Sequence, residues 1–310
     1  MTPSSRPLDP LAIILMLILC VSWGFNQIAG KVALVDVPPI AQAALRSLGA
    51  TAVLSALALW REPRIFRRDE SLWAGVAAGL LFGAEFVALY LALQLSSAAR
   101  VILFLYSAPF FVALGVFLFV PRERLGPFQW IGMALAFAGV VAALSGSGEK
   151  DSRLGDFLAI LGAAGWGAVT VMTKATSLQR TPPTKTLLYQ LAISGVMCAI
   201  VSLAVGEKWS AHVSTIGAVA MVYQTFWVAS VTYLVWFWLL KHYRAGELSA
   251  FTFLSPIVGV LAGHILLGDE LTANFMAALA LVAAGVVLVN LPSRALTPRA
   301  SGRVAPPSPE

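Results

Sequence analysis

Ten long apolar segments separated by short loops restrict this chain to a membrane fold. Charged residues, Pro or Gly bound each segment, and each is close to the 20 or so residues that a helix needs to cross the hydrocarbon core of a bilayer. The segments are about twice as long as a transmembrane β-strand and lack its polar alternation, which excludes a β-barrel. The ten predicted helices span residues 11–30, 39–60, 72–94, 98–120, 128–145, 154–174, 185–205, 213–240, 247–268 and 272–291.

The composition agrees, because 59% of the 310 residues are hydrophobic and only 12% are charged. A soluble domain carries about 25% charged residues. Ten crossings with short loops leave no room for a soluble catalytic domain, so the function must lie between the helices. We therefore predict an all-α integral membrane protein, with residues 1–10 as a cytoplasmic N-terminus and residues 292–310, rich in Pro and Arg, as a disordered cytoplasmic tail.

The distribution of Lys and Arg predicts the orientation. Fifteen of the 21 basic residues flank the helix ends on the side of the N-terminus, and four flank the opposite ends. Basic residues collect in cytoplasmic loops, so both termini are expected in the cytoplasm of a bacterial cell with the chain in its inner membrane. The basic loops are then an orientation signal, and nucleic acid is not an expected partner. Cys20 and Cys198 lie inside apolar segments and indicate neither a disulfide framework nor a metal site.

Four landmarks of the first half recur in order in the second half, at offsets of 143 to 147 residues. They are a Trp-Gly pair with Lys eight residues after the Trp, a Pro-Pro pair that opens the next helix, a Pro with Glu fourteen residues later, and Ala-Gly-Val-Val. The matched positions are Trp23 and Trp166, Lys31 and Lys174, Pro38 and Pro182, Pro109 and Pro256, Glu123 and Glu270, and 138–141 and 284–287. This order predicts a duplicated five-helix unit, 11–145 and 154–291, joined by a linker at 146–153.

A unit of five helices reverses the side from which its copy enters the membrane, so the two halves are predicted to be inverted repeats. The charge pattern supports this independently, since Lys31 falls on the outer side and Lys174 on the inner side. Inverted repeats occur in many secondary transporters that expose one midplane site alternately to each side. The repeat is the step from sequence to function.

These landmarks resemble the EamA family of the drug/metabolite transporter superfamily, over residues 11–291. The resemblance implies ten helices and export of small metabolites, often amino acids or their derivatives, by alternating access that is proton-linked or facilitated. It also implies a cavity between helices 1–4 and 6–9, with helices 5 and 10 peripheral. Arg46 matches an arginine common in the family, whereas its repeat counterpart is Gln190, so the site is expected to be asymmetric.

Glu85, near the centre of the predicted helix 72–94, is the candidate for proton coupling. An ionisable group at this depth costs about 2.5 to 3.5 kcal/mol on insertion scales, so it usually faces a cavity or a partner. The alternative is a structural residue that joins helices by hydrogen bonds. Gly75, Gly79 and Gly83 form a ridge on the same helix, about 160° from Glu85, and are expected to pack against another helix.

Other polar and aromatic residues within the helices are candidates for binding a solute, with helix packing or an interfacial belt as the alternative. Some share one face of the first helix and recur in the sixth, and the aromatic residues of helix 213–240 make an aromatic amino acid one candidate solute. Trp236 and Trp238 are instead expected in an interfacial belt. The substrate-binding candidates are Trp23, Asn26, Gln27, Arg46, Tyr106, Trp166, Thr170, Tyr189, Gln190, Tyr223, Gln224 and Trp227.

Pro109 and Pro256 each remove one backbone hydrogen bond at matched positions, and we predict kinks there that act as hinges. Glu123 and Glu270 are expected to fix helix corners. The rival hypothesis is a membrane enzyme or a channel acting on a small amphipathic solute. Three dispersed histidines and the lack of phosphate, zinc or nucleophile motifs disfavour an enzyme, so no cofactor or metal is expected. The expected partners are a small solute, the lipid bilayer and protons, with no required protein partner.

Overall fold

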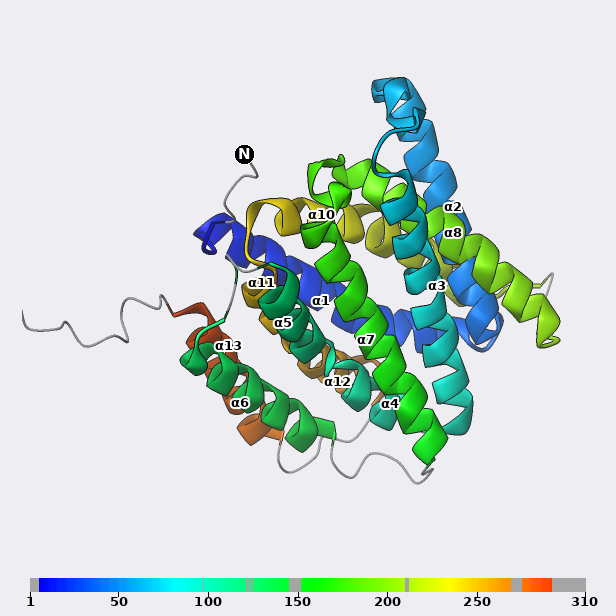
Figure 1. The fold of residues 1–310 in the computed structure, drawn as a ribbon. Coiled ribbons are helices and arrows are strands. Elements are labelled where there is room, and N and C mark those ends of the chain that lie inside the picture. The colour runs from blue at the N-terminus through cyan, green and yellow to red at the C-terminus, as the bar shows by residue number, and fades with distance from the viewer. Residues whose placement is uncertain are drawn as a thin grey trace, which may run out of the picture.

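The computed structural model describes residues 6–96, 98–120, 123, 125–144, 152–209, 212–268 and 275–291. Within these ranges every named element is a helix, and the helices lie at the positions of the ten predicted segments (Figure 1). The elements are α1 Pro10–Ala33, α2 Pro39–Arg61, η1 Pro63–Phe66, α3 Leu72–Leu95, α4 Ala98–Leu105, α5 Ala108–Phe119, α6 Pro127–Leu144, α7 Arg153–Ala175, η3 Ser177–Arg180, α8 Pro183–Ala204, α9 Thr215–Val222, η4 Tyr223–Thr232, α10 Tyr233–His242, α11 Ala245–Phe251, α12 Leu254–Leu267 and α13 Phe275–Asn290. The predicted tail 292–310, most of the linker 146–153 and Glu270 lie outside the described residues.

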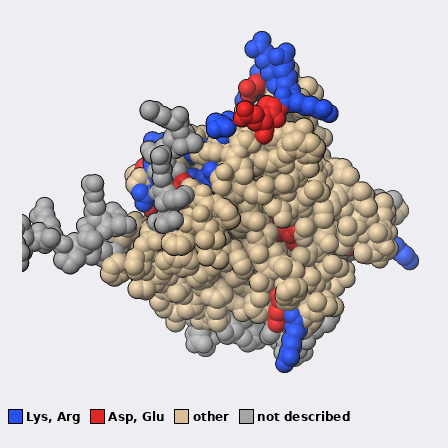
Figure 2. Space-filling view, in the orientation of Figure 1, with Lys and Arg blue, Asp and Glu red and all other residues tan. Residues whose placement is uncertain are grey.

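Eight of the segments are long and apolar enough to cross a membrane, and the shorter apolar helices α6 and α13 complete the ten. Figure 2 shows most of the charged side chains gathered in groups near the edge of the molecule, while uncharged residues cover most of the visible face. Large apolar side chains such as Ile14, Leu80 and Ile265 are more than half exposed. This surface suits contact with lipid tails, and the chain is a multi-pass membrane protein.

The predicted fourth and ninth helices are each divided in two, which corrects the prediction of a single helix in each place. The first break lies at Tyr106 and Ser107 between α4 and α5, and the second lies at Thr252 and Phe253 between α11 and α12. In both cases the matched proline falls in the first turn of the second piece. Proline is tolerated there because the first backbone N–H groups of a helix have no partner within it. The prolines therefore begin new helices where kinks were expected.

The predicted eighth helix contains ten residues of π-helix, η4, between α9 and α10. The Ser230 hydroxyl donates to the Thr225 carbonyl five residues earlier, at 2.8 Å, which fits the wider turn. Three side chains of this segment bond to α1: the Tyr223 hydroxyl donates to the Ser22 carbonyl, the Trp227 indole N–H donates to the Ser22 hydroxyl, and the Thr232 hydroxyl accepts from the Trp23 indole N–H. The π segment is thus held against the first helix.

The same helix contacts are found when the two halves are exchanged. Helix α3 of the first half packs on α7 and α8, and its counterpart α9, η4 of the second half packs on α1 and α2. Likewise α5 packs on α7, and α12 packs on α1. The pairs α2 with α8 and α6 with α13 cross between the halves, and the second of these lies at one side of the bundle (Figure 1). The fifth and tenth predicted helices, which are α6 and α13, are thus peripheral, as the resemblance implied.

The two halves have opposite orientations. The Asp9 carboxylate at the start of α1 accepts a hydrogen bond from the Tyr243 hydroxyl at 2.7 Å, and the Tyr243 carbonyl accepts one from Lys174 in the last turn of α7 at 2.6 Å. The first helix therefore begins on the face where the sixth helix ends. Lys31, in the last turn of α1, lies at the opposite face from its repeat counterpart Lys174.

Glu123 fixes a corner on this N-terminal face, as predicted. Its carboxylate accepts from Lys174 at 2.7 Å and from the backbone N–H of Ala245, the first residue of α11, at 2.9 Å. Both side chains of the ion pair are almost fully buried. The contact joins the end of α7 to the start of α11.

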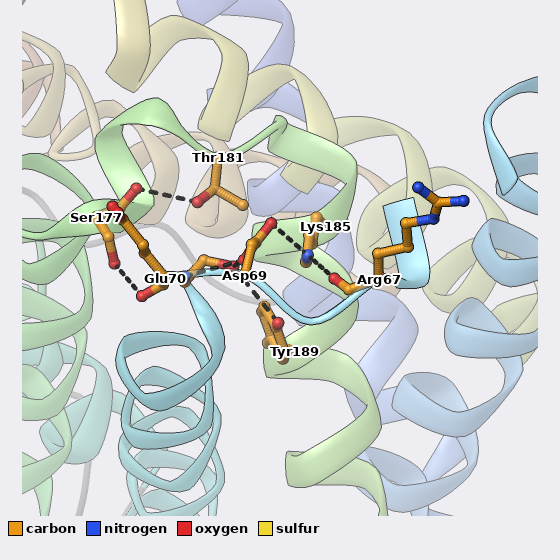
Figure 3. A network of polar contacts seen from close by, with 8 residues as sticks. Arg67, Asp69, Glu70, Ser177, Thr181, Lys185 and Tyr189 are labelled. Carbon is orange, nitrogen blue, oxygen red and sulfur yellow. Dashed lines mark hydrogen bonds and ion pairs between the residues drawn. The ribbon is translucent and has the colours of Figure 1, made fainter. Parts of the chain in front are cut away.

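A second polar network joins the halves on the same face (Figure 3). Lys185, at the start of α8, donates to the Asp69 carboxylate and to the Arg67 carbonyl, both at 2.7 Å. Asp69 also accepts from the Ser71 hydroxyl and backbone N–H. The hydrogen bonds from Lys185 and Ser71 lower the pKa of Asp69 from 3.8 to about 2. This pair fixes the loop between α2 and α3.

On the opposite face, Glu207 holds the start of α2. Its carboxylate oxygens accept from the backbone N–H groups of Ile40 and Ala41 at 3.0 and 2.8 Å. A carboxylate is favoured there because the N-terminus of a helix carries partial positive charge. Each face is therefore closed by an acidic residue from one half that holds a helix start of the other half.

The glycines of the Ala-Gly-Val-Val landmarks permit the close approach of α6 and α13. A Cβ atom at Gly285 would lie 2.5 Å from the backbone oxygen of Gly132, and one at Gly139 would lie 2.8 Å from the backbone oxygen of Ala278. Backbone cannot move aside as a side chain can. The repeated glycines are therefore explained by packing between the halves.

We predict that Gly285→Ala lowers the free energy of unfolding by about 1 to 3 kcal/mol, because the added methyl group overpacks this contact. Thermal unfolding in detergent would measure the change. The matched control is Gly30→Ala in α1, where a Cβ atom meets nothing within 4 Å, and this variant should be at least as stable as the original chain. Equal effects of the two variants would contradict the packing explanation.

We also predict a small loss of stability in Asp69→Asn that depends on pH. The pKa of Asp69 is lowered in the folded protein, so the ion pair contributes stability above about pH 4 and loses it as the pH falls towards 2. The difference in thermal midpoint between the variant and the original chain should thus be constant near neutral pH, shrink as the pH falls through 2, and vanish at about pH 1. Glu70→Gln is the control, since the Glu70 pair with Arg180 is highly exposed and should contribute little. A difference that stays constant down to about pH 1 would rule out the ion pair as its source.

Candidate functional site

A cavity of about 190 Å³ lies between the two halves. Its wall comes from α1, α2, α3 and α4 with Tyr106 in the first half, and from α7, α8 and α10 in the second. The predicted helices 1–4 and 6–8 thus line the cavity. The ninth predicted helix, which is α11 and α12, contributes no residue to this lining, although the resemblance implied that it would. The lining residues are Trp23, Asn26, Gln27, Arg46, Phe82, Glu85, Phe86, Leu89, Ile102, Leu105, Tyr106, Trp166, Val169, Thr170, Gln190, Tyr233, Trp236 and Phe237.

Aromatic rings form much of the cavity wall, with Trp23 at the centre of the group. The Trp23 ring makes edge contacts with Trp166, Tyr233 and Trp236 at centroid distances of 6.2, 6.4 and 5.7 Å. Its indole N–H donates to the Thr232 hydroxyl at 3.0 Å, which fixes the ring. The wall is apolar and rigid, and it suits the non-polar part of a small solute.

Arg46 brings a buried positive charge to this wall. Its residue is 3% exposed, and its Nε and Nη2 atoms have no hydrogen-bond partner. The guanidinium carbon lies 4.5 Å from the centroid of the Phe86 ring and 6.0 Å from that of Tyr233. The aromatic faces stabilise the cation, yet its planar donors stay available for a carboxylate.

Glu85 brings a buried carboxyl group to the same cavity. It is 6% exposed, and its Oε2 atom has no hydrogen-bond partner. Among the described residues it forms no ion pair with Arg46. The glycine ridge of α3 faces elsewhere, as predicted, since Gly75, Gly79 and Gly83 contact α8.

Further polar groups on the wall also lack partners. Both side-chain polar atoms of Gln190, the Asn26 carbonyl oxygen and the Thr170 hydroxyl are buried without a hydrogen bond. Gln27 is the exception, since its amide donates to the Tyr106 hydroxyl at 3.3 Å. Buried polar groups are almost always paired in proteins, so a group of unpaired ones around a cavity indicates a place where solute or water binds.

Four predicted binding residues do not line this cavity. Tyr189 packs on Gly75 and lies within 3.4 Å of the Ser71 hydroxyl. Tyr223 and Trp227 bond to Ser22 through their polar atoms, and the Trp227 side chain is 40% exposed at the outer surface. Gln224 bonds to Gln42. All four lie in helices, as predicted. The glycine ridge of α3 takes up Tyr189, and the register of the π segment turns the other three side chains towards contacts between helices.

Sequence reasoning missed several aromatic lining residues. Phe82, Phe86, Tyr233 and Phe237 line the cavity, and so does Trp236, which is 4% exposed. The expectation of an interfacial belt was therefore wrong for Trp236. Phe82 lies three residues before Glu85 and four before Phe86, a spacing that places Phe82 between the other two on one side of α3. For α10 no such signal exists, because the π segment shifts the helical register just before it.

The described residues contain no group of three or more His, Cys, Asp or Glu that could hold a metal ion. The cavity wall offers one cation, one acid and neutral amides and hydroxyls among aromatic rings.

Comparisons with known proteins agree with this architecture. The model of the EamA-like transporter family matches the chain twice, at residues 10–145 and 153–291. The chain is 30% identical over 300 residues to the uncharacterized transporter YvbV of Bacillus subtilis, covering 93% of this chain and 94% of that protein. It is 26% identical over 286 residues to a probable amino-acid metabolite efflux pump of Salmonella typhimurium, covering 88% and 93%.

An uncharacterized inner membrane transporter of Escherichia coli, YedA, is 25% identical over 277 residues and 88% of each chain. One protein of known crystal structure shares the fold, with a TM-score of 0.80 and 21% identity over 93% of this chain and 99% of that one. The duplicated match, the ten helical segments and the opposed halves lead to one conclusion. This chain belongs to the EamA-like transporter family.

Proposed function

We propose that this protein is a secondary active transporter that exports amino acids or related small metabolites across the bacterial inner membrane. The observation that carries the proposal is the set of buried, unpartnered polar groups around one cavity between the inverted halves. The relatives named as probable amino-acid metabolite efflux pumps support this substrate class. The excess of Lys and Arg on the N-terminal side supports cytoplasmic termini.

Arg46 and Glu85 suit a zwitterionic solute. The guanidinium offers donors to a carboxylate, and Glu85 offers an acceptor to an ammonium group or a site for a proton. Because a proton and a cationic group compete for one carboxylate, proton binding at Glu85 would release the solute and couple export to the proton gradient. Trp23, Trp166, Tyr233 and neighbouring rings would hold the side chain of the solute.

The helix breaks support alternating access. Tyr106 at the first break lines the cavity, and Pro109 follows in the first turn of α5; Pro256 takes the matching place in α12. Few backbone hydrogen bonds cross such breaks, so the two pieces can change their angle at low cost. We propose that these breaks are the hinges, and that the ion pairs on the N-terminal face and Glu207 on the other face open in turn.

Counterflow in liposomes is the direct test, with a panel of aromatic and small polar amino acids. Purified protein should exchange at least one zwitterionic amino acid, and Glu85→Gln should lose uphill, proton-driven flux while it keeps part of the exchange. Arg46→Gln should lose both, because it removes the carboxylate site. Conductance without counterflow would identify a channel, and chemical conversion of the solute would identify an enzyme. Undiminished uphill flux in Glu85→Gln would exclude its role in coupling.

We predict that Trp236→Ala reduces counterflow at least tenfold, because its ring faces the cavity. Trp227→Ala is the matched control. It removes an indole from the same predicted helix, but the Trp227 ring lies at the outer surface and bonds to Ser22. This variant should transport normally. Equal loss in both variants, at equal amounts of folded protein, would show that a general defect of this segment is being measured.

A further inference from the structure

Four arginines lie within eight residues at and directly after the end of the second helix, α2: Arg61, Arg64, Arg67 and Arg68. Glu62 is the only acidic residue of the segment 61–68, which therefore carries a net charge of +3. All four arginines are exposed. Figure 2 shows Lys and Arg side chains gathered at the top of the molecule, over the end of α2 and η1 in Figure 1.

The segment is a fixed structure. Ile65, in η1, is 6% exposed and anchors the turn in the bundle. The backbone N–H groups of Ile65 and Arg67 donate to the carbonyls of Glu62 and Arg64, and the Arg67 carbonyl accepts from Lys185. The backbone that carries the arginines is thus fixed in an anchored turn, which lowers the entropic cost of bringing their side chains to one ligand.

In the described part of the chain, the two acids that follow these arginines pair with other basic residues. Asp69 pairs with Lys185 and Glu70 pairs with Arg180. Figure 3 shows the Arg67 guanidinium pointing away from Asp69, although the Arg67 carbonyl takes part in the network. The Arg61 guanidinium lies 5.5 Å from the centroid of the Trp60 ring, a contact that leaves its positive charge uncompensated.

Exposed aromatic residues lie close to the arginines in the sequence, at the end of α2, in η1 and at the start of α3. Trp60 is 78% exposed, Trp73 is 80% exposed and Phe66 is 49% exposed. Trp rings favour the headgroup level of a bilayer, so they place the guanidinium groups at the depth of the phosphates. An orientation signal needs only the charge of the loop; the anchored turn and the flanking rings are additional features.

We propose that residues 61–68 bind the headgroup of an anionic phospholipid in the leaflet on the N-terminal face. Clusters of four or more basic residues next to a membrane helix attract anionic lipids, and guanidinium groups pair bidentately with phosphate oxygens. The Trp60 ring, 5.5 Å from the Arg61 guanidinium, would lie at the headgroup level beside the same lipid. This site is separate from the cavity between the halves and does not depend on the transported solute.

The test is native mass spectrometry of the full chain in neutral detergent, titrated with phosphatidylglycerol or phosphatidylcholine. The original chain should bind phosphatidylglycerol at least tenfold more tightly than phosphatidylcholine. The triple variant Arg64→Gln, Arg67→Gln, Arg68→Gln should lower the affinity for phosphatidylglycerol at least tenfold and leave that for phosphatidylcholine unchanged. Purified protein is used, so a change of membrane orientation in cells does not affect the result.

The matched control is Arg153→Gln with Lys208→Gln, which removes exposed charges elsewhere and should keep the preference for phosphatidylglycerol. The thermal midpoint of each variant confirms folding, and the replacement of Arg67 keeps its carbonyl contact with Lys185. Equal affinity of the original chain for both lipids, or an unchanged affinity in the triple variant, would overturn the proposal. Displacement of the lipid by millimolar inorganic phosphate would also overturn it, since it would indicate a site for free anions.

Discussion

A charged side chain inside a membrane protein needs a partner, and the structure around Arg46 and Glu85 depends on this constraint. The two residues line one cavity, both are almost fully buried, and they do not pair with each other among the described residues. The Phe86 and Tyr233 rings stabilise the Arg46 cation only in part. Such an arrangement is costly unless the missing partners arrive with a solute, a proton or water.

The duplicated scaffold supplies the shape of the cavity, and departures from the duplication supply its chemistry. Exchange of the halves relates the helix pairs, the breaks before Pro109 and Pro256 and the contact between α6 and α13. The charged residues are not repeated in this way. The repeat counterpart of Arg46 is Gln190, and the predicted eighth helix has no carboxylate that corresponds to Glu85. Symmetry therefore suits the opening of either face, while asymmetry suits recognition of a solute with two different ends.

Much of the fold was predictable from the sequence because apolar length and matched landmarks depend only on local patterns. The ten segments, the opposed halves, the corner at Glu123 and the glycine ridge of α3 all follow from such patterns and are confirmed. Of the twelve predicted binding residues, eight line the cavity, and they come from α1, α2, α7, α8 and the break between α4 and α5. They are Trp23, Asn26, Gln27, Arg46, Tyr106, Trp166, Thr170 and Gln190.

The eighth helix shows why the rest was not predictable. Ten residues of π-helix change the angular position of every later side chain, so an α-helical projection misplaces Trp236. The Trp227 indole instead bonds to Ser22, a contact made across 205 residues of sequence. Tyr189 was misplaced for a related reason, because the space beside it is set by a glycine on another helix, Gly75. Long-range packing of this kind leaves no local signal.

Under the proposed alternating access, the cavity between the halves opens in turn to the two sides of the membrane. Thr170, which lines the cavity and is 1% exposed, is a suitable reporter position once Cys20 and Cys198 have been replaced. Thr170→Cys in oriented membrane vesicles should react with a membrane-impermeant maleimide added on either side, and a transported solute should slow both reactions. Reaction from one side only, under every gradient and solute condition, would contradict alternating access.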